Sequence, residues 1–236
     1  MKSSAWVSAW KKIANNPIVV SFKKMDKSKK NGKEARGLRI GLTGGMGCGK
    51  TTAVGVFREL GFGVLESDVI VRDLWDTDAE VKKAALKRWP AIAEVSSQKS
   101  DIKISRRKVA EIVFADPQEL EWLENLLHPR VRLCWQSAMK VEPEKDWVVE
   151  IPLLFEKSLA SGFDYTLCIA SSPAIQAARL VARGLSPAEI AARQARQWPL
   201  REKIERADWV ALNDGSVDFL RRQLVHFAAK LCHSSF

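Results

Sequence analysis

The stretch Leu38-Arg39-Ile40-Gly41-Leu42-Thr43-Gly44-Gly45-Met46-Gly47-Cys48-Gly49-Lys50-Thr51-Thr52 decides the fold of this chain. Its apolar first part, residues 38–43, predicts a β-strand, and residues 51–60 show the apolar spacing of a helix. The loop between them has the spacing Gly-x-x-x-x-Gly-Lys-Thr, which in this strand-to-helix setting is typical of a phosphate-binding loop. A glycine-rich turn without a ligand is the alternative, and the complete pattern favours nucleotide binding.

Each residue type in this loop has a physical reason. Glycine adopts backbone angles that are closed to other residues, and it lets consecutive amides face phosphate oxygens. The start of the helix adds a partial positive charge. Lys50 is predicted to reach the β- and γ-phosphates of ATP, and the Thr51 hydroxyl to coordinate Mg²⁺. The candidate nucleotide-binding residues of the loop are Gly44, Gly45, Met46, Gly47, Cys48, Gly49, Lys50, Thr51 and Thr52.

Short apolar runs alternate with helical patterns from residue 38 onward. This alternation predicts an α/β fold with a parallel sheet flanked by helices. Further strands are predicted at residues 62–65, 147–151, 165–170 and 209–212, and a C-terminal helix from about residue 216. Residues 69–141 are rich in amphipathic helical patterns, interrupted by Trp89-Pro90, Asp116-Pro117 and His128-Pro129. We interpret this region as a helical insertion between strands.

The length of 236 residues and the hydrophobic content of 46% suit one compact P-loop domain, residues 37–236, behind a basic extension, residues 1–36. Residues 1–39 hold nine Lys and two Arg against Asp26 and Glu34, so they account for +9 of the formal net charge of +10. The rest of the chain is nearly neutral, and we therefore expect no nucleic-acid partner. The lysine-rich second half of the extension is expected to be disordered. A solvated extension, a targeting peptide and a partner-binding or membrane-surface arm are its three interpretations.

Cysteine, histidine and hydropathy patterns exclude several classes of protein. No C-x-x-C pair occurs, and the cysteines and histidines lack the spacing of zinc ligands. Free thiols are typical of a reducing compartment, so we expect a cytoplasmic protein. No apolar run approaches the roughly 20 residues of a membrane span, so we expect no membrane partner. The residues concerned are Cys48, Cys134, Cys168, Cys232, His128, His226 and His233.

Candidate catalytic side chains follow the predicted strands. Asp68 comes after the second strand, where ligands gather at the carboxyl edge of a parallel sheet, and its carboxylate can accept a proton or help to hold a metal. A helix N-cap is the other interpretation of Asp68. Arg72 shares a helix face with Asp68, either to bind an anionic substrate or as an ordinary exposed ion pair. Arg179 and Arg183 repeat this four-residue spacing, which suits phosphate neutralisation or a solvated helix face.

Together these segments resemble the dephospho-CoA kinase family over about residues 38–225. The resemblance is carried by the loop with its preceding Leu42-Thr43, by Ser67-Asp68 with Arg72, and by several later motifs. These are His128-Pro129, Pro152-Leu153-Leu154-Phe155-Glu156, Gln176-x-x-Arg179-Leu180-x-x-Arg183, Gln194 and Ala207-Asp208-Trp209-Val210 to Asn213. The loop is generic to many kinases, whereas the ordered series is specific.

The resemblance implies transfer of the ATP γ-phosphate to the ribose 3′-hydroxyl of dephospho-CoA, the last step of coenzyme A biosynthesis. It also implies a P-loop kinase core, a helical insertion at about residues 69–141 that helps to hold the CoA precursor, and a lid at about residues 176–206. The oligomeric state stays open. The implied catalytic residues are Asp68 as general base, Lys50 and Arg179.

The resemblance also implies a set of binding residues. On the substrate side it points to Thr43 near the transferring phosphate, Asp68, Arg72, His128 and Glu156. On the nucleotide side it points to Arg179 at the ATP phosphates and Asn213 near the adenine.

Two departures from the family pattern stand out. Glu66-Ser67-Asp68 replaces the usual Asp-Ala-Asp, and Cys48 replaces a serine, which we expect to make activity sensitive to oxidation. Two other functions compete with the main interpretation. One is a P-loop kinase for a nucleoside, nucleotide or sugar acid. The other is a nucleotide-dependent switch, but the chain lacks Asn-Lys-x-Asp, and Glu150 is the nearest substitute for a strand-terminal aspartate.

Overall fold

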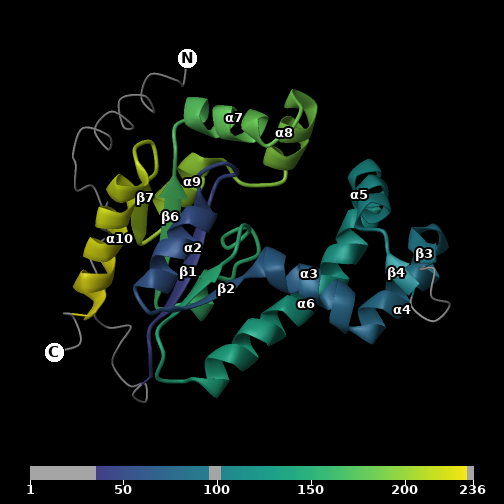
Figure 1. Ribbon diagram of the computed structural model, residues 1–236, viewed down its shortest axis with the longest axis horizontal. Helices are drawn as coiled ribbons and strands as arrows, with labels where there is room; N and C mark the ends of the chain where they lie inside the picture. Colours follow the sequence, from purple (N-terminus) through teal and green to yellow (C-terminus); the bar gives the residue numbers. More distant parts are fainter. Residues whose placement is uncertain (1–35, 96–101, 233–236) are drawn as a thin grey trace. The chain divides into compact units, whose positions relative to one another are not determined.

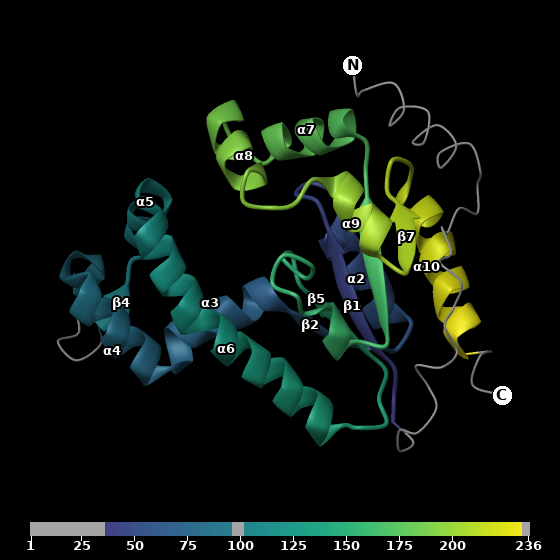
Figure 2. The same ribbon diagram turned by 180° about the vertical axis from the view of Figure 1, so that it is seen from behind.

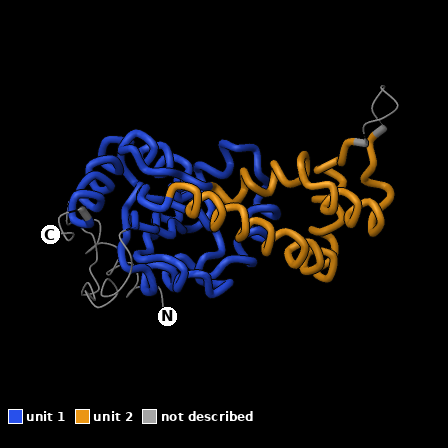
Figure 3. The backbone as a smooth tube through the Cα atoms, turned by 90° about the horizontal axis from the view of Figure 1, so that it is seen from below, with its two compact units in different colours: residues 1–65, 143–236 blue, residues 66–142 orange. Residues whose placement is uncertain are grey.

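The computed structural model describes residues 36–95 and 102–232. Residues 1–35 of the N-terminal extension and His233 lie outside the described residues. The expectation of disorder in the extension concerns residues that are likewise outside the described range. The chain divides into two compact units (Figure 3). Unit 1 comprises the described residues up to 65 and from 143 onward, and unit 2 comprises residues 66–142.

Unit 1 is built on a five-stranded sheet (Figure 1). Its order is β2 (Gly63–Glu66), β5 (Trp147–Glu150), β1 (Arg39–Gly44), β6 (Tyr165–Ala170) and β7 (Trp209–Leu212). Strand β1 pairs in parallel with both β5 and β6, and β6 pairs in parallel with β7. The predicted α/β fold with a parallel sheet is confirmed.

The register of the sheet aligns the carboxyl ends of its central strands. Leu42 of β1 lies beside Glu150 of β5, and Gly44 lies beside Ile169 of β6. Ala170, at the end of β6, pairs with Leu212 at the end of β7. The loops after these four strands therefore open at one edge of the sheet, which is where parallel sheets bind ligands.

Helices cover both faces of the sheet. Helices α2 (Lys50–Glu59) and α10 (Val217–Cys232) lie against one face, and α9 (Leu200–Arg206) packs on β1 and β6 from the other (Figures 1 and 2). Between β5 and β6 lies a short 3-10 helix, η3 (Ala160–Gly162). Helices α7 (Pro173–Ala182) and α8 (Pro187–Gln194) follow β6, and Ser186 begins α8 with a capping box to Glu189.

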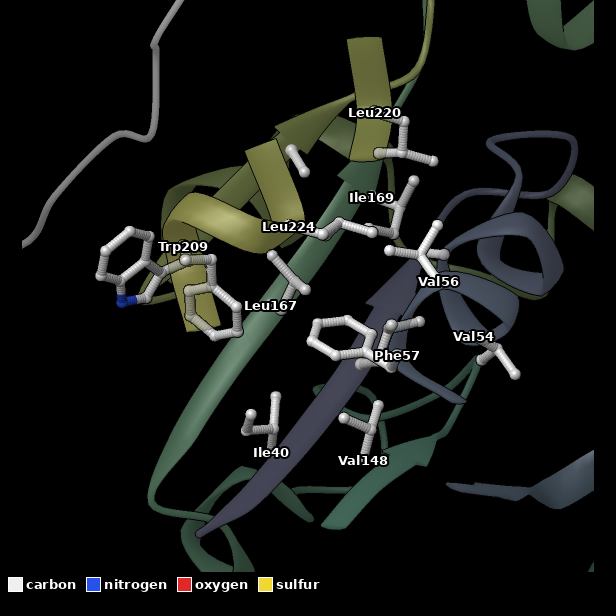
Figure 4. Close-up of a cluster of buried hydrophobic side chains, with 14 of the residues drawn as sticks. Ile40, Val54, Val56, Phe57, Val148, Leu167, Ile169, Trp209, Leu220 and Leu224 are labelled. Atoms are coloured by element: carbon white, nitrogen blue, oxygen red, sulfur yellow. The ribbon is translucent and has the colours of Figure 1, made fainter. Parts of the chain in front are cut away.

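The core of unit 1 lies between the sheet and helices α2 and α10 (Figure 4). Ile40, Val148 and Leu167 point from three adjacent strands toward Phe57 of α2, and all four side chains are buried. Strands β5 and β7 are buried along their whole length, and α2 packs on β5 while α10 packs on β7. This explains why their sequences are continuous apolar runs rather than alternating ones.

Unit 2 is mainly helical. Its elements are α3 (Ser67–Thr77), α4 (Ala79–Arg88), η2 (Pro90–Ile92), β3 (Ala93–Val95), β4 (Ile102–Ile104), α5 (Arg106–Ala115) and α6 (Pro117–Val141). The antiparallel pair β3–β4 was not predicted from the sequence. An interruption was expected at Pro129, but α6 continues through this residue, and Leu127 and Val131 are both buried on it. Burial of this apolar face offsets the backbone hydrogen bond that a proline removes.

Candidate active site

The glycine-rich loop joins β1 to α2 and has the backbone that its sequence predicts. Gly47 and Gly49 have φ angles of +79° and +86°, in the left-handed region that favours glycine. A Cβ atom on Gly49 would lie 1.9 Å from Asn213 Nδ2, so this position excludes any side chain. Lys50 is the first residue of α2. The loop, the helix start and the lysine together suit an anionic phosphate.

Lys50 extends back over the loop toward the end of β5. Its Nζ atom donates hydrogen bonds to the carbonyl oxygens of Gly44 at 3.4 Å and Gly45 at 3.3 Å. The same atom lies 3.9 Å from Oε1 of Glu150, whose side chain is 7% exposed. A cation and a carboxylate thus meet at the carboxyl edge of the sheet.

Arg179 of α7 donates hydrogen bonds to the loop and to the ends of two neighbouring strands. Its guanidinium donates to the Gly47 carbonyl at 3.3 Å, to the Ser171 hydroxyl at 3.1 Å and to the Asn213 carbonyl at 2.8 Å. The Asn213 side chain in turn donates from Nδ2 to the Cys48 carbonyl at 2.9 Å. These bonds join the loop to the ends of β6 and β7, so Arg179 and Asn213 hold the loop in shape whatever else they bind.

Thr43 and Glu156 belong to a second group of contacts beside the loop. The buried Thr43 hydroxyl donates to the Pro152 carbonyl at 3.2 Å. Lys203 Nζ donates to the same carbonyl at 2.6 Å and lies 2.8 Å from Oε1 of Glu156. This group joins the ends of β1 and β5 to helix α9.

Cys48 is fully buried within the loop. Burial is the main cause that raises the pKa of its thiol, and it outweighs the opposing influence of Lys50. The reactive form of a cysteine is the thiolate, which this environment disfavours. The structure therefore argues against the oxidation sensitivity that the sequence suggested.

Asp68, Arg72 and His128 belong to unit 2. Asp68 lies in the first turn of α3, and its side chain is exposed. Arg72 Nε donates to the backbone carbonyl of Asp68 at 3.3 Å, so the two residues meet through the backbone. His128 is exposed on α6. The structure places Asp68 on a helix that directly follows β2 in the chain.

In the described part of the chain, no group of three or more His, Cys, Asp or Glu is arranged to hold a metal ion. Thr51, at the exposed start of α2, and Glu150 are two side chains near the loop whose oxygen chemistry suits Mg²⁺. Among the described helices, none has the length and apolar character to span a bilayer.

Two residues of the site were missed as candidates by the sequence analysis. Glu150 was considered only as a substitute for the strand-terminal aspartate of a nucleotide-dependent switch. A carboxylate that ends a continuous apolar strand is itself a signal of a functional site. Lys203 lies in the exposed-looking pattern Leu200-Arg201-Glu202-Lys203, which provides no such signal. Its 0% exposure depends on how α9 packs against the sheet.

Comparison with known proteins agrees with this geometry. The family model for dephospho-CoA kinase matches residues 38–218. A dephospho-CoA kinase of Synechococcus sp. (strain CC9902) is 38% identical over 188 residues, covering 79% of this chain and 93% of the relative. One of Chlorobaculum tepidum is 34% identical over 190 residues, covering 79% and 91%.

Solved structures show the same likeness. The structure of TT1252 from Thermus thermophilus has a TM-score of 0.69 at 34% identity, with 83% of this chain and 98% of that chain covered. A dephospho-CoA kinase from Campylobacter jejuni has a TM-score of 0.60 at 25% identity, with 84% and 98% covered. With its phosphate-binding loop at the carboxyl edge of a parallel sheet and a family match over most of its length, this chain belongs to the dephospho-CoA kinase family.

Proposed function

We propose that this protein transfers the γ-phosphate of ATP to the ribose 3′-hydroxyl of dephospho-CoA, giving CoA and ADP. The observation that carries the proposal is the family match over residues 38–218, which includes the loop, Glu156 and Asn213. The described geometry supports it, because Lys50, Glu150 and Arg179 gather around one phosphate-binding loop. Free thiols among the described cysteines suit a cytoplasmic enzyme.

The chemistry divides between a proton acceptor and groups that neutralise phosphate charge. The 3′-oxygen forms its bond to the γ-phosphorus as the bond from that phosphorus to the β,γ-bridging oxygen breaks. Asp68 accepts the hydroxyl proton, and Arg72 beside it positions the substrate. Lys50 stabilises negative charge on the transferred group, as cationic side chains do in phosphoryl transfer.

Arg179 has two roles in the proposed reaction. It holds the loop through the Gly47 carbonyl, and it presents positive charge at the loop from a second direction. Asn213 fixes the Cys48 carbonyl and lies on the nucleotide side of the site. Both residues therefore preorganise the binding of ATP, which lowers the cost of ordering the loop during the reaction.

Mg²⁺ is the metal that suits this chemistry, and when bound it would neutralise negative charge on the ATP phosphates. The Thr51 hydroxyl and the Glu150 carboxylate are the residues that we propose hold it. Lys50, 3.9 Å from Glu150, keeps that carboxylate directed toward the loop.

We further propose roles for the two remaining parts of the chain. Residues 69–141 hold the CoA precursor, with His128 as one of the contacts. Residues 176–206 act as the lid, and its outer part is α8, in which every residue is exposed or half-buried. Helix α9, by contrast, packs on the sheet, so the mobile part of the lid ends before it.

The decisive experiment is an assay of the purified protein with Mg-ATP and dephospho-CoA, compared with nucleosides, nucleotides and sugar acids as competing acceptors. We expect CoA to form, and we expect Asp68→Asn to lower kcat by about 10²–10⁴-fold while ATP binding is kept, because a general base contributes that much. Asp73→Asn, an exposed carboxylate on the same helix, is the matched control. Preference for another acceptor would overturn the proposed substrate, and full activity of Asp68→Asn would remove Asp68 as the base.

A further inference from the structure

A buried ion pair lies inside unit 1, beside the phosphate-binding loop. Lys203 of α9 is 0% exposed, Glu156 is 9% exposed, and Lys203 Nζ lies 2.8 Å from Glu156 Oε1. Removing two charges from water costs free energy that well-packed apolar residues of similar size would not incur. Packing alone therefore gives no reason for a lysine at this position.

Lys203 makes two sets of contacts, which we call its first and second arms. The first arm reaches the start of the phosphate-binding loop. Its Nζ atom donates to the Pro152 carbonyl at 2.6 Å, and the Thr43 hydroxyl donates to the same oxygen at 3.2 Å. Thr43 directly precedes Gly44, and Pro152 lies two residues beyond Glu150. One carbonyl oxygen thus fixes the distance between the chain that leaves β1 and the chain that leaves β5.

The second arm passes through Glu156 to the segment before α9. Oε1 of Glu156 accepts the backbone N–H of Trp198 at 2.9 Å, in addition to its contact with Lys203. Oε2 of Glu156 is buried and has no hydrogen-bond partner among the described residues. All the contacts that the structure gives this carboxylate thus run through one oxygen, and without Lys203 that oxygen would lose its counter-charge.

We propose that Lys203 is a positioning residue for phosphoryl transfer, an inference that rests on the proposed function. Lys203 does not touch the substrate. It holds Thr43 and the end of β5 in register with the loop, and through Glu156 it holds the chain that links α8 to α9. In-line transfer depends on the relative placement of these parts, and a displacement of about 1 Å is enough to cost about 10²-fold in rate.

The test compares Lys203→Met with Arg201→Met, a matched control on the same helix. Arg201 is exposed and pairs across the surface with Glu205, at 2.7 Å. We expect Lys203→Met to lower kcat for CoA formation by about 10²-fold while the KM for ATP changes by less than about threefold. Arg201→Met should stay within about twofold of the wild type, since exposed ion pairs contribute little. A folded Lys203→Met protein with wild-type kcat would overturn the proposal, as would a loss confined to KM.

If Lys203 had a purely structural role, Lys203→Met would lower the amount of folded protein and not the kcat of the protein that stays folded. Kinetics are measured at a temperature at which circular dichroism shows every variant to be folded, so that loss of kcat does not reflect loss of protein. Lys203→Met, Glu156→Gln and the double variant then form a cycle. If Lys203 acts through Glu156, the double variant should be no slower than the slower single variant. Losses that multiply would overturn the second arm of the proposal, because the two residues would then act separately.

Hydrogen exchange at the Trp198 amide provides a readout that does not depend on turnover. We expect exchange in the peptide that contains Trp198 to be faster in full-length Lys203→Met than in Arg201→Met or the wild type, because Glu156 loses the ammonium that holds it. Unchanged exchange would overturn the second arm of the proposal. If the wild type fails to convert dephospho-CoA, the proposed function fails, and this measurement still decides whether Lys203 positions the segment.

Discussion

At Gly49 the backbone conformation and a neighbouring side chain both exclude a larger residue. Its φ angle is +86°, and an added Cβ atom would lie 1.9 Å from Asn213 Nδ2. Gly61 has the same φ of +86°, but a Cβ atom there would meet nothing within 4 Å. The two glycines thus separate the cost of the backbone angle from the cost of the close approach.

We predict that Gly61→Ala lowers the free energy of unfolding by about 1–2 kcal/mol, the cost of a left-handed residue with a side chain. Gly49→Ala should carry this cost and also displace Asn213 from the Cys48 carbonyl. Loss of that bond, about 1 kcal/mol, corresponds to roughly a fivefold loss of ATP affinity if the loop must be re-formed on binding. Thermal unfolding and titration with ATP measure both effects. Equal ATP affinity in the two variants would show that Asn213 does not hold the loop.

Cys48 illustrates a limit of residue-level inference from sequence. A thiol in a phosphate-binding loop suggests reactivity, because neighbouring positive charge stabilises a thiolate. The structure shows that burial dominates and raises the pKa of the thiol despite Lys50 and Arg179. The balance between desolvation and charge depends on the solvent exposure of the sulfur, which the position in the sequence does not define.

At the scale of elements, helices α4 and α6 of unit 2 are joined by one carboxylate. Oε2 and Oε1 of Glu119 accept hydrogen bonds from Arg88 at 2.5 and 2.9 Å, and Oε2 also accepts from the Trp89 indole at 2.8 Å. The hydrogen bonds from Arg88 are the main cause that lowers the pKa of Glu119 below its ordinary value. Glu119 lies in the first turn of α6, and its contacts with Arg88 and Trp89, 31 and 30 residues away in the chain, could not be read from the sequence.

This lowered pKa predicts how the stability of unit 2 depends on pH. Between the ordinary pKa of about 4.3 and the lowered folded value, the unfolded chain binds more protons, so acid favours unfolding. The contribution of Glu119 is therefore complete above the ordinary pKa and is lost as the pH falls through the folded value. We expect Glu119→Gln to lower Tm at pH 7 and to have the same Tm as the wild type at a pH below the folded pKa.

Glu111→Gln is the control. The Glu111 carboxylate pairs with Arg107 on the surface at 3.2 Å, and its replacement should change Tm less at pH 7. A difference in Tm between Glu119→Gln and the wild type that does not change with pH would contradict this account.

At the scale of the whole molecule, the basic charge of the chain and its folded units are separate features. Arg36, the first described residue, forms two hydrogen bonds with Asp164 at 2.9 and 2.7 Å, and both side chains are largely buried, at 19% and 16% exposure. Asp164 also accepts the backbone N–H of Arg39 at 2.9 Å. This contact fastens the start of β1 to the chain that leads into β6.

We predict that removal of residues 1–35 leaves Tm and turnover unchanged, whereas Arg36→Gln in the full chain lowers the free energy of unfolding by about 1.5–3 kcal/mol, the usual contribution of hydrogen bonds between charged groups. Urea unfolding of the two proteins beside the wild type measures this difference. Loss of turnover on removal of residues 1–35, with Tm unchanged, would assign the extension a part in the enzyme's activity.

Much of unit 1 was predictable, because its signals are local. The strand predicted at residues 165–170 coincides with β6, and that at 209–212 with β7, since each is a short run of residues suited to a fully covered sheet. The loop and its lysine follow from a motif eight residues long. In unit 2, strands β3 and β4 were missed because three residues each are too few to establish an alternating pattern. Pro129 misled because burial of Leu127 and Val131, and not the backbone preference of the proline, decides whether α6 continues.

The sequence by itself determined the α/β class, the phosphate-binding loop and the family, because these depend on residue types at fixed spacing along the chain. Only the tertiary structure decided what surrounds each functional group. Lys203 and Pro152, 51 residues apart, meet because α9 packs against the sheet, and Lys50 meets Glu150 because β1 and β5 are neighbours. Burial, hydrogen-bond partners and the pKa of a group arise from residues that are distant in the chain and close in space, and periodicity within one segment contains no information about them.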